Sequence, residues 1–578
     1  MRGIGRRTAA AIALGAGLLL AGSGAARVED TPESLRAEAF EAAQWAIASD
    51  AADALAKVSA RFAQGDDALG RLAEERETLL GRRDALELEL ERLYAVQGDE
   101  GRDRRAAARA DYEQVRARLT AVDADIEARF PAYAELTSPR ALTVAETQAL
   151  LKPDEALLLV LVNPEATYVW GLSRDRVEWA RAEDLGDAAM TASVAKLRES
   201  LTTAAQNRSD LDPSIFAGRP VAAFDRAEAH RLYAELIEPV EGVFEGKSTL
   251  ITVVTGALTT LPLAVLSTEA PTGSDTAETL AATPWLIDRY ALATLPSVSS
   301  LKALRCYLVS DPALRSPGCP SSAGAAPATR QATRVGTRDF TLAAFGAPLL
   351  AGAPDYASRG APAADSILGE GRLADVSRLK ALPYLPGSKT ELEALKTRYP
   401  RALVRIGGEA TETAVRQGDA AALSNARFVV FSTHGLMAGS TAAEPGLVMT
   451  PPDQATEADD GYLSASEAAQ LRLNAEFVVL SACNTAASDG RPGGEGLSGL
   501  ARAFFYAGAR SVLVSHWEVS DAATTELITA SFAALDAPGA DVGDRARALQ
   551  AGMRAVRANR AWTHPAFWAP FTLVGEPG

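Results

Sequence analysis

Two nine-residue stretches of this chain share one apolar pattern and end in residues that could do chemistry together. The first runs from Ala426 to His434, and the second runs from Ala475 to Cys483, 49 positions further along. Each is a short β-branched and aromatic run, typical of a strand that is buried on both faces of a parallel sheet. Neighbouring parallel strands end at the same sheet edge, where open α/β sheets place their sites. The pattern predicts that His434 and Cys483 lie side by side.

A cysteine beside a histidine is the smallest group of side chains that supports thiolate chemistry. The imidazole can take the thiol proton and can orient the nucleophile. The chain contains only four histidines and three cysteines, so the pairing is informative. His434 and Cys483 are therefore the candidate catalytic residues of a cysteine peptidase, or of the remains of one.

The segment between the two stretches supports their parallel pairing. Ser464 and Glu467 have the spacing of a capping box, which predicts a helix that ends near residue 471. A strand, a helix and a second strand form a right-handed βαβ unit with parallel strands. After Cys483 the sequence predicts a glycine-rich stretch over 490–496, a helix over 497–506 and a third strand over 509–515.

Five short strings stand around these predicted strand ends. They are His434-Gly435, Ser481-Ala482-Cys483-Asn484-Thr485, Gly494-Glu495-Gly496, Ala503-Phe504-Phe505 with Ala507-Gly508-Ala509 after it, and Trp517-x-Val519-x-Asp521. Together they resemble a CHAT domain, the caspase-like domain associated with tetratricopeptide repeats and related to separases. The resemblance is specific over about 390–578 and looser back to about 150. The chain departs from the family pattern at its front, because it shows no repeat of about 34 residues.

The resemblance implies a fold and a set of roles. The fold is a three-layer α/β caspase-like sandwich with a largely parallel sheet, preceded by a degenerate α/β half. His434 is then the general acid and base, and Cys483 is the nucleophile that forms a thioester. The N–H groups of Gly435 and Cys483 form the oxyanion hole. Some relatives read a basic P1 residue through an acidic pocket, for which Asp521 and Glu495 are candidates; the alternative for each is a helix cap or a solvated loop acid.

The 578 residues are too many for one hydrophobic core. Leucines spaced by seven over 72–93 and an apolar stripe over 112–126 predict an antiparallel helical hairpin. Strands over 155–162 and 166–172 predict a β-hairpin. The predicted parts are a signal peptide (1–26), an α-helical hairpin region (27–140), a degenerate caspase-like half (143–310), a linker-rich segment (311–380) and a catalytic caspase-like half (381–578).

The first residues have the layout of a secretory signal peptide. Three arginines precede an apolar stretch from Thr8 to Gly22, and small residues follow it. This predicts cleavage after Ala25 or Ala26 and an exported protein, periplasmic or secreted, with an uncleaved membrane anchor as the alternative. We expect no integral membrane segment after cleavage.

Export changes how the cysteines are interpreted. In an oxidising compartment Cys306 and Cys319 are candidates for a disulfide, which would leave Cys483 as the odd thiol. The net charge of −16 argues against nucleic acid as a partner. The expected partners are a peptide or protein substrate and a protein activator that docks on the N-terminal helices, and no cofactor is expected.

Three other interpretations compete with the peptidase. Gly494, Gly496 and Gly499 match a dinucleotide fingerprint, but a dozen residues separate them from the preceding strand. His434, Cys483 and His516 could converge on a metal ion, although no paired ligand spacing appears. The strongest alternative is a non-catalytic caspase-like scaffold whose helical hairpin presents a partner-binding face.

Overall fold

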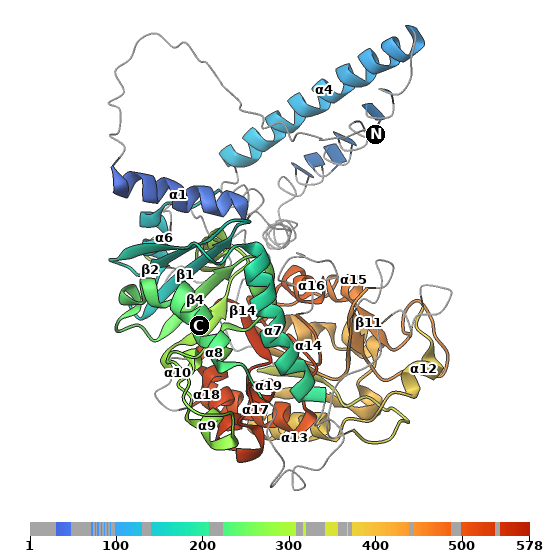
Figure 1. Ribbon diagram of the computed structural model, residues 1–578. Coiled ribbons are helices and arrows are strands. Elements are labelled where there is room, and N and C mark those ends of the chain that lie inside the picture. The colour runs from blue at the N-terminus through green and yellow to red at the C-terminus, as the bar shows by residue number, and fades with distance from the viewer. Residues whose placement is uncertain are drawn as a thin grey trace, which may run out of the picture.

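The computed structural model shows a three-layer α/β body with a helical hairpin standing beside it (Figure 1). The structure describes residues 31–47, 99–129, 140–206, 223–307, 316–319, 341–355, 373–437, 444–486, 499–537 and 544–578, together with 364, 367 and scattered helical positions between 71 and 93. The predicted signal peptide lies outside the described residues.

The centre of the body is one sheet, in which eleven strands can be traced through the described residues. Its strands, in spatial order, are β3 (Val177–Ala182), β2 (Thr167–Leu172), β1 (Glu155–Val162), β4 (Thr249–Val254), β5 (Ala291–Thr294), β14 (Phe571–Gly575), β13 (Ser511–Ser515), β12 (Phe477–Ser481), β8 (Phe428–Ser432), β6 (Leu342–Gly346) and β7 (Ala402–Ile406). The predicted β1–β2 hairpin is confirmed by their antiparallel pairing.

The sheet contains two parallel sets that run in opposite directions. Strands β1, β4, β5 and β14 run one way. Strands β13, β12, β8, β6 and β7 run the other way, because β13 and β14 are antiparallel. The carboxyl ends of the two sets therefore lie at opposite edges, and the ends of β8 and β12 share one of them.

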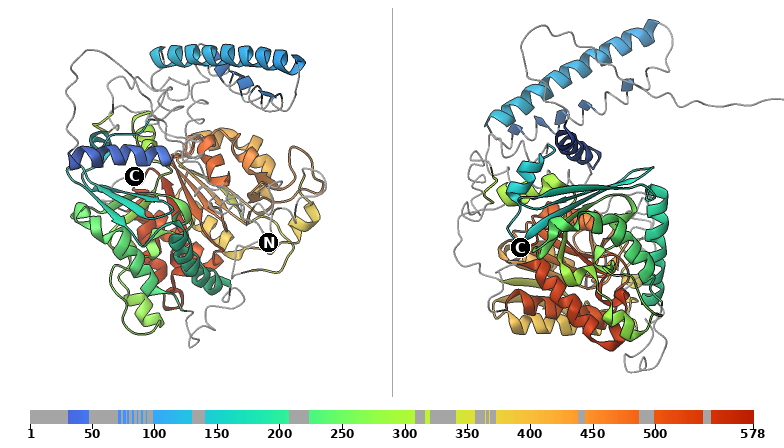
Figure 2. Two further views of the ribbon diagram at one scale, coloured as in Figure 1. Left: turned by 45° about the horizontal axis from the view of Figure 1, so that its top comes forward. Right: turned by 60° about the vertical axis from the view of Figure 1, so that its left-hand side comes forward.

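Helices cover both faces of the sheet, as the right-hand view of Figure 2 shows with the blue α1 on one side and the red α17 and α18 on the other. One face carries α1 (Pro32–Ala46), α6 (Val144–Leu150), α11 (Val298–Lys302), α14 (Ala420–Asn425), α15 (Ala465–Ala468) and α16 (Gly499–Ala507). The other carries α7 (Asp187–Gln206), α8 (Arg226–Leu236), α9 (Ala277–Ala282), α10 (Leu286–Arg289), α13 (Pro386–Arg398), α17 (Asp521–Leu535), α18 (Arg545–Ala558) and α19 (Pro565–Trp568).

Burial on both faces explains why these strands have continuous apolar sequences. Val429 and Phe431 of β8 pack in the core beneath α16, whereas Phe428 and Val430 pack in the core beneath α17. Every one of the five residues of β8 and of β12 is buried. A strand that alternated apolar and polar residues would expose polar groups to one of these cores.

The crossover from β8 to β12 is more elaborate than the predicted single helix. It carries a small antiparallel sheet of β9 (Gly435–Leu436), β10 (Gly446–Val448) and β11 (Tyr462–Ser464), and the capped helix α15 ends at Ala468 rather than near residue 471. Leu436, Val448 and Tyr462 pack with Leu379 of α12 (Val376–Lys380) in a separate core. These strands are too short for the alternation rule to identify them.

The predicted helical hairpin is present among the described residues. Helix α4 (Asp99–Arg129) packs Val115 and Leu119 against Leu86. Arg76 pairs with Asp123 at 2.7 Å near one end of the hairpin, and Arg105 donates to the Leu93 carbonyl at 2.8 Å near the other, so the two helical stretches are antiparallel.

The segment predicted to be rich in linkers, residues 311–380, contains one strand of the central sheet. Strand β6 lies within that range, is buried throughout and pairs with both β7 and β8. Its sequence, Leu-Ala-Ala-Phe-Gly, is rich in small residues, so composition alone did not separate it from the Ala/Gly-rich stretches on either side.

The front half is joined to the carboxyl terminus by a buried ion cluster. The Arg305 guanidinium contacts Glu155 at 2.7 Å and Glu576 at 2.9 Å, and all three residues are largely buried. Burial alone would raise the pKa of Glu576, but Arg305 outweighs it and holds that pKa below its usual value. The neighbouring Cys306 forms a disulfide with Cys319, so the pairing that the sequence left open is present in the structure.

We predict that Arg305→Leu lowers the free energy of unfolding by about 3–5 kcal/mol, because it leaves two carboxylates without their buried cation. Urea denaturation of the folded chain measures the change. Arg116→Leu is the matched control, since the Arg116 side chain is 64% exposed and 3.7 Å from Glu113. An exposed pair of this kind contributes less than about 1 kcal/mol. Equal losses in the two variants would contradict the role of the buried cluster.

Candidate active site

The ends of β8 and β12 bring His434 and Cys483 to equivalent positions. The two strands are parallel and in register from Phe428 with Phe477 to Ser432 with Ser481. His434 stands two residues beyond Ser432, and Cys483 stands two residues beyond Ser481. The predicted parallel pairing of these strands is therefore confirmed, with the same 49-residue offset that the sequence shows.

Gly435 fits closely against the cysteine. A Cβ atom at this position would lie 2.5 Å from the main-chain carbonyl oxygen of Cys483, so only glycine fits without a shift of the backbone. Val448 N–H donates to the His434 carbonyl at 3.0 Å, which makes the next pair, Leu447 with Gly435, a non-hydrogen-bonded one. The ladder with β10 therefore does not use the N–H of Gly435.

A main-chain carbonyl orients the histidine. His434 is fully buried, and its Nε2 lies 2.8 Å from the carbonyl oxygen of Pro383. A carbonyl oxygen can only accept, so Nε2 carries the proton and Nδ1 is the nitrogen that can take one. The sequence indicated no orienting carboxylate for His434. The structure assigns this task to Pro383, whose carbonyl has no signature in the sequence.

The thiol of Cys483 is covered by the segment that follows β13. Cys483 is 1% exposed, and its Sγ accepts a hydrogen bond from Val519 N–H at 3.1 Å. The cover is anchored by Trp517, whose buried indole donates to the carbonyl of Ala566 at 3.0 Å. Asn484, directly after the cysteine, has a φ of +55°, a left-handed conformation that asparagine tolerates better than most residues. We call residues 517–519 the cover segment.

Helix α13 holds both strand ends through two buried side chains. Ser388 Oγ lies 2.9 Å from Ser432 Oγ and also donates to the Ser432 carbonyl. Glu391, one turn further along, accepts from Ser481 Oγ at 3.0 Å. Both α13 residues are fully buried. They were missed from the sequence, because the spacing that aims them at neighbouring strands has meaning only once α13 is docked.

The two predicted substrate-binding acids have different outcomes. Asp521 is 1% exposed, and its Oδ2 accepts the N–H of Gly387 at 2.5 Å, in the first turn of α13. In this conformation it serves a helix N-terminus, which was the alternative considered for it. Glu495 lies outside the described residues, as do Gly494 and Gly496 of the dinucleotide pattern. Both substrate roles stay predictions.

His516, directly after β13, lies in a different environment from that of His434. Its Nε2 lies 3.0 Å from Thr572 Oγ1 on β14. Burial, assisted by Arg198, lowers the pKa of His516 to about 3, so the ring is neutral at ordinary pH. Arg198 donates to the carbonyl of His516 at 3.2 Å. Through the described residues, no group of three or more His, Cys, Asp or Glu side chains is placed to hold a metal ion.

Comparison with known proteins finds one matching family model and two relatives that match a part of the chain. A family model described as the CHAT domain matches residues 226–576. Tetratricopeptide repeat protein 28 of Mus musculus is 39% identical over 115 residues, and its Homo sapiens counterpart is 34% identical over 114 residues. Each match covers 20% of this chain, which spans only 4% of the length of either relative.

Solved structures show remote similarity. A Saccharomyces cerevisiae separase–securin complex matches with a TM-score of 0.38 and 11% identity, over 78% of this chain and 31% of that chain. The complex of Porphyromonas gingivalis RgpB pro- and mature domains matches with a TM-score of 0.32 and 11% identity, over 66% of this chain and 77% of that chain.

We predict that Gly435→Ala destabilises the chain by about 1–3 kcal/mol, because the added methyl group must displace the Cys483 carbonyl. Chemical denaturation measures the loss. Gly418→Ala is the control, since the nearest atom to its new methyl group is the Thr413 carbonyl oxygen at 3.8 Å. It should change stability by less than about 1 kcal/mol. A Gly435→Ala variant as stable as the control would show that the contact is not close in solution.

We predict that His516 makes the chain less stable as the pH falls. Its pKa is about 6.5 in the unfolded chain and about 3 in the folded one, so between these values the unfolded state binds the extra proton. Stability then rises with pH, and the loss from about pH 7 to about pH 5 is about 2 kcal/mol. His516→Gln should remove this part of the slope.

Thr572→Val is the control for this pH effect. It removes the hydrogen bond to Nε2 but keeps the buried imidazole, so most of the slope should remain. Urea denaturation at the two pH values measures both variants. A slope unchanged in His516→Gln would assign the pH dependence to other groups.

Proposed function

Because the chain belongs to the CHAT domain family, we propose that it is a cysteine peptidase with Cys483 as nucleophile and His434 as general base. One observation carries this proposal: the in-register pairing of β8 with β12 sets the two residues at equivalent positions beyond adjacent strand ends. The contact of Gly435 with the Cys483 carbonyl supports the closeness of the two strand ends.

The reaction follows from the orientation of the imidazole. His434 Nδ1 accepts the thiol proton, and the thiolate of Cys483 attacks the carbonyl carbon of the scissile amide. The tetrahedral oxyanion is stabilised by the N–H groups of Gly435 and Cys483. It collapses to a thioester as His434 protonates the leaving amine. Water then attacks the thioester, with His434 taking its proton, and the carboxylate product and free thiol are released.

We propose that the peptidase is latent in this conformation. The Cys483 thiol is buried and bonded to the cover segment, and His434 has no exposed surface. A substrate must therefore displace residues 517–519, or a partner must do so. We place that protein activator on the N-terminal helical hairpin, which projects from the body as a separate arm (Figure 1).

Two features support export to an oxidising compartment. The first residues have the layout of a cleaved signal peptide. The Cys306–Cys319 disulfide is of a kind that persists in periplasmic and secreted proteins. Among the helices that the structure describes, none combines the length and the apolar character of a membrane span.

The alternative is a scaffold without catalytic activity. The full burial of His434 and the coverage of Cys483 favour it, since neither side chain meets solvent in this conformation. In that case the two residues act as ordinary core groups, and the helical arm is the functional surface.

We predict that a peptidyl acyloxymethyl ketone with Arg or Lys at P1 forms one adduct with the mature chain, which intact mass measures. Cys483→Ala and His434→Ala should form none. His230→Ala is the matched histidine control and should label normally, because His230 bonds to the Ser267 carbonyl in the front half. An adduct that survives in Cys483→Ala would show that the nucleophile is assigned wrongly.

Latency is tested with Trp517→Ala, which removes the anchor of the cover segment. Labelling of this variant at a higher rate than the wild type would identify the cover segment as the barrier. Silence of both proteins, under reducing conditions and with uncharged as well as basic P1 residues, would favour the scaffold.

A further inference from the structure

The two halves of the sheet meet along a seam that is only partly closed. Strand β5 pairs with β14 through one position alone, Thr294 with Val574. On the two sides of the seam, β4 pairs with β5 at four positions and β13 with β14 at five. On either side of this one pair, β5 and β14 are therefore not joined as neighbouring strands of the sheet.

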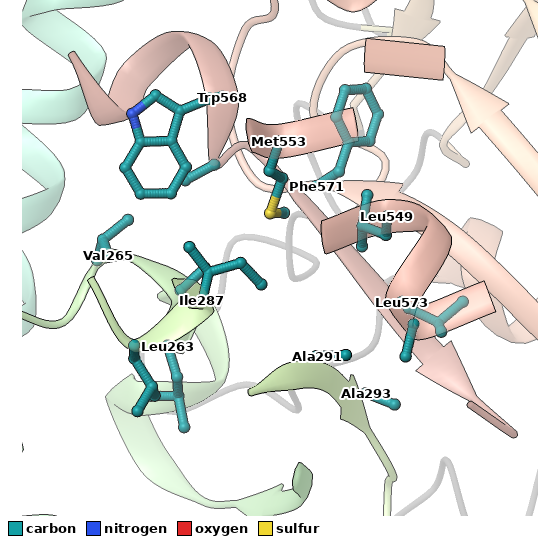
Figure 3. Close-up of a cluster of buried hydrophobic side chains, with 14 of the residues drawn as sticks. Leu263, Val265, Ile287, Ala291, Ala293, Leu549, Met553, Trp568, Phe571 and Leu573 are labelled. Atoms are coloured by element: carbon teal, nitrogen blue, oxygen red, sulfur yellow. The ribbon is translucent and has the colours of Figure 1, made fainter. Parts of the chain in front are cut away.

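A cavity of about 270 Å³ occupies this split. Its lining comes from both helical layers, since Ala46 and Ile47 end the α1 segment on one face and Leu549 and Met553 lie on α18 on the other. Figure 3 shows Leu263 and Ile287 of the front half facing Leu549, Met553, Phe571 and Leu573 across this region. We call this space the seam cavity.

The strand residues that line the seam cavity do not fill it, although residues at the middle of a sheet are normally closely packed. Val254, Leu292 and Thr572 belong to strands near the middle of the sheet, yet each keeps part of its surface accessible. Protein interiors are close-packed, and an apolar void forfeits contacts on all its walls. A ligand that fills the void would restore these contacts.

The polarity of the walls defines the chemistry of that ligand. None of the lining residues that the structure describes is Asp, Glu, Lys or Arg. The polar groups are threonine hydroxyls, such as the bonded pair Thr252 and Thr294 at 3.0 Å, and the neutral His516 bonded to Thr572. A charged ligand would lose its hydration without gaining a counter-ion. A hydroxyl group could bond to these side chains, because a threonine oxygen has spare acceptor capacity.

We propose that the seam cavity binds an uncharged small molecule with an alkyl or aromatic body and a single hydroxyl group. The size agrees with this class, since an engineered apolar cavity of about 150 Å³ in another protein admits benzene. A cavity of about 270 Å³ has room for a longer body and its hydroxyl group.

The seam cavity also touches the element that covers the thiol. His516 lies in its wall and directly precedes the cover segment, residues 517–519. A ligand that moves His516 changes the position of Val519 N–H relative to Cys483 Sγ. We infer that occupancy changes the accessibility of Cys483, and this second step rests on the proposed peptidase function of that residue.

Binding is tested on the full mature chain by NMR of isotope-labelled methionine methyl groups, with n-hexanol as the probe. Met553 lines the seam cavity, whereas Met437 and Met449 do not. We expect the Met553 signal, assigned with Met553→Leu, to shift saturably with n-hexanol while those of Met437 and Met449 stay in place. Hexanoate, which has the same alkyl body and a carboxylate, should cause no shift. A Met553 signal that does not move, equal shifts of all three, or equal binding of hexanoate would overturn the proposal.

A filled cavity supplies the second measurement. Leu292→Trp places a large ring in the seam cavity and should weaken n-hexanol binding by at least about tenfold. Leu349→Trp introduces the same ring on a side chain that is 58% exposed and outside the lining, and should leave binding unchanged. Full affinity in a folded Leu292→Trp variant would place the ligand elsewhere. If Leu292→Trp does not fold, the methyl shifts of the wild type decide.

The coupling has its own readout, the rate at which iodoacetamide alkylates Cys483. A change of several-fold on saturation with n-hexanol, absent in Leu292→Trp, supports the link through His516. Binding with an unchanged alkylation rate would remove the link but keep the ligand site. Failure of the peptidase proposal is seen separately, in the ketone labelling, and leaves the methyl shifts unaffected.

Discussion

The register between β8 and β12 is the constraint on which the rest of the molecule depends. Ser432 pairs with Ser481, and a slip of one residue would turn either His434 or Cys483 toward the opposite core. On the face of the sheet that carries α17, helix α13 fixes this register, because Ser388 bonds to Ser432 and Glu391 bonds to Ser481. It is held at the edge by the contact of Gly435 with the Cys483 carbonyl. His434 and Cys483 stand at equivalent positions here because these three contacts require the same alignment of two strands.

The opposed directions of the two parallel sets explain why the site has one location. Strands β13, β12, β8, β6 and β7, which run opposite to β1, β4, β5 and β14, end at the edge that carries His434 and Cys483. Among the described strands of the front half, β2 alone ends at that edge, where β1, β4, β5, β14 and β13 separate it from β12, and β5 flanks the carboxyl-terminal strand β14. The Arg305 cluster fastens this half to Glu576 near the carboxyl terminus, in surroundings where an unpaired charge would be strongly unfavourable. The front half therefore supports the sheet, and both candidate catalytic residues stand on the second half.

The same geometry that brings the two catalytic candidates together also keeps them covered. The Pro383 carbonyl fixes the imidazole, and Val519 N–H holds the sulfur. The cover segment follows β13, which lies between the thiol strand and the seam. Motion at the seam and exposure of the thiol can therefore be linked through one short stretch of chain, residues 516–519. In this arrangement the thiol of Cys483 is shielded from solvent by the cover segment.

The sequence by itself determined the two matched strands, their 49-residue offset, the helical hairpin and the identity of His434 and Cys483 as candidates. These features are visible because apolar runs and helical spacing record burial locally. Only the tertiary structure decided that the Pro383 carbonyl orients His434, that Asp521 serves α13 and that β6 is a core strand. It alone decided how the two halves meet at the seam. These depend on which distant segments pack together, and a carbonyl group or a pair of helix side chains carries no local signal of its eventual partner.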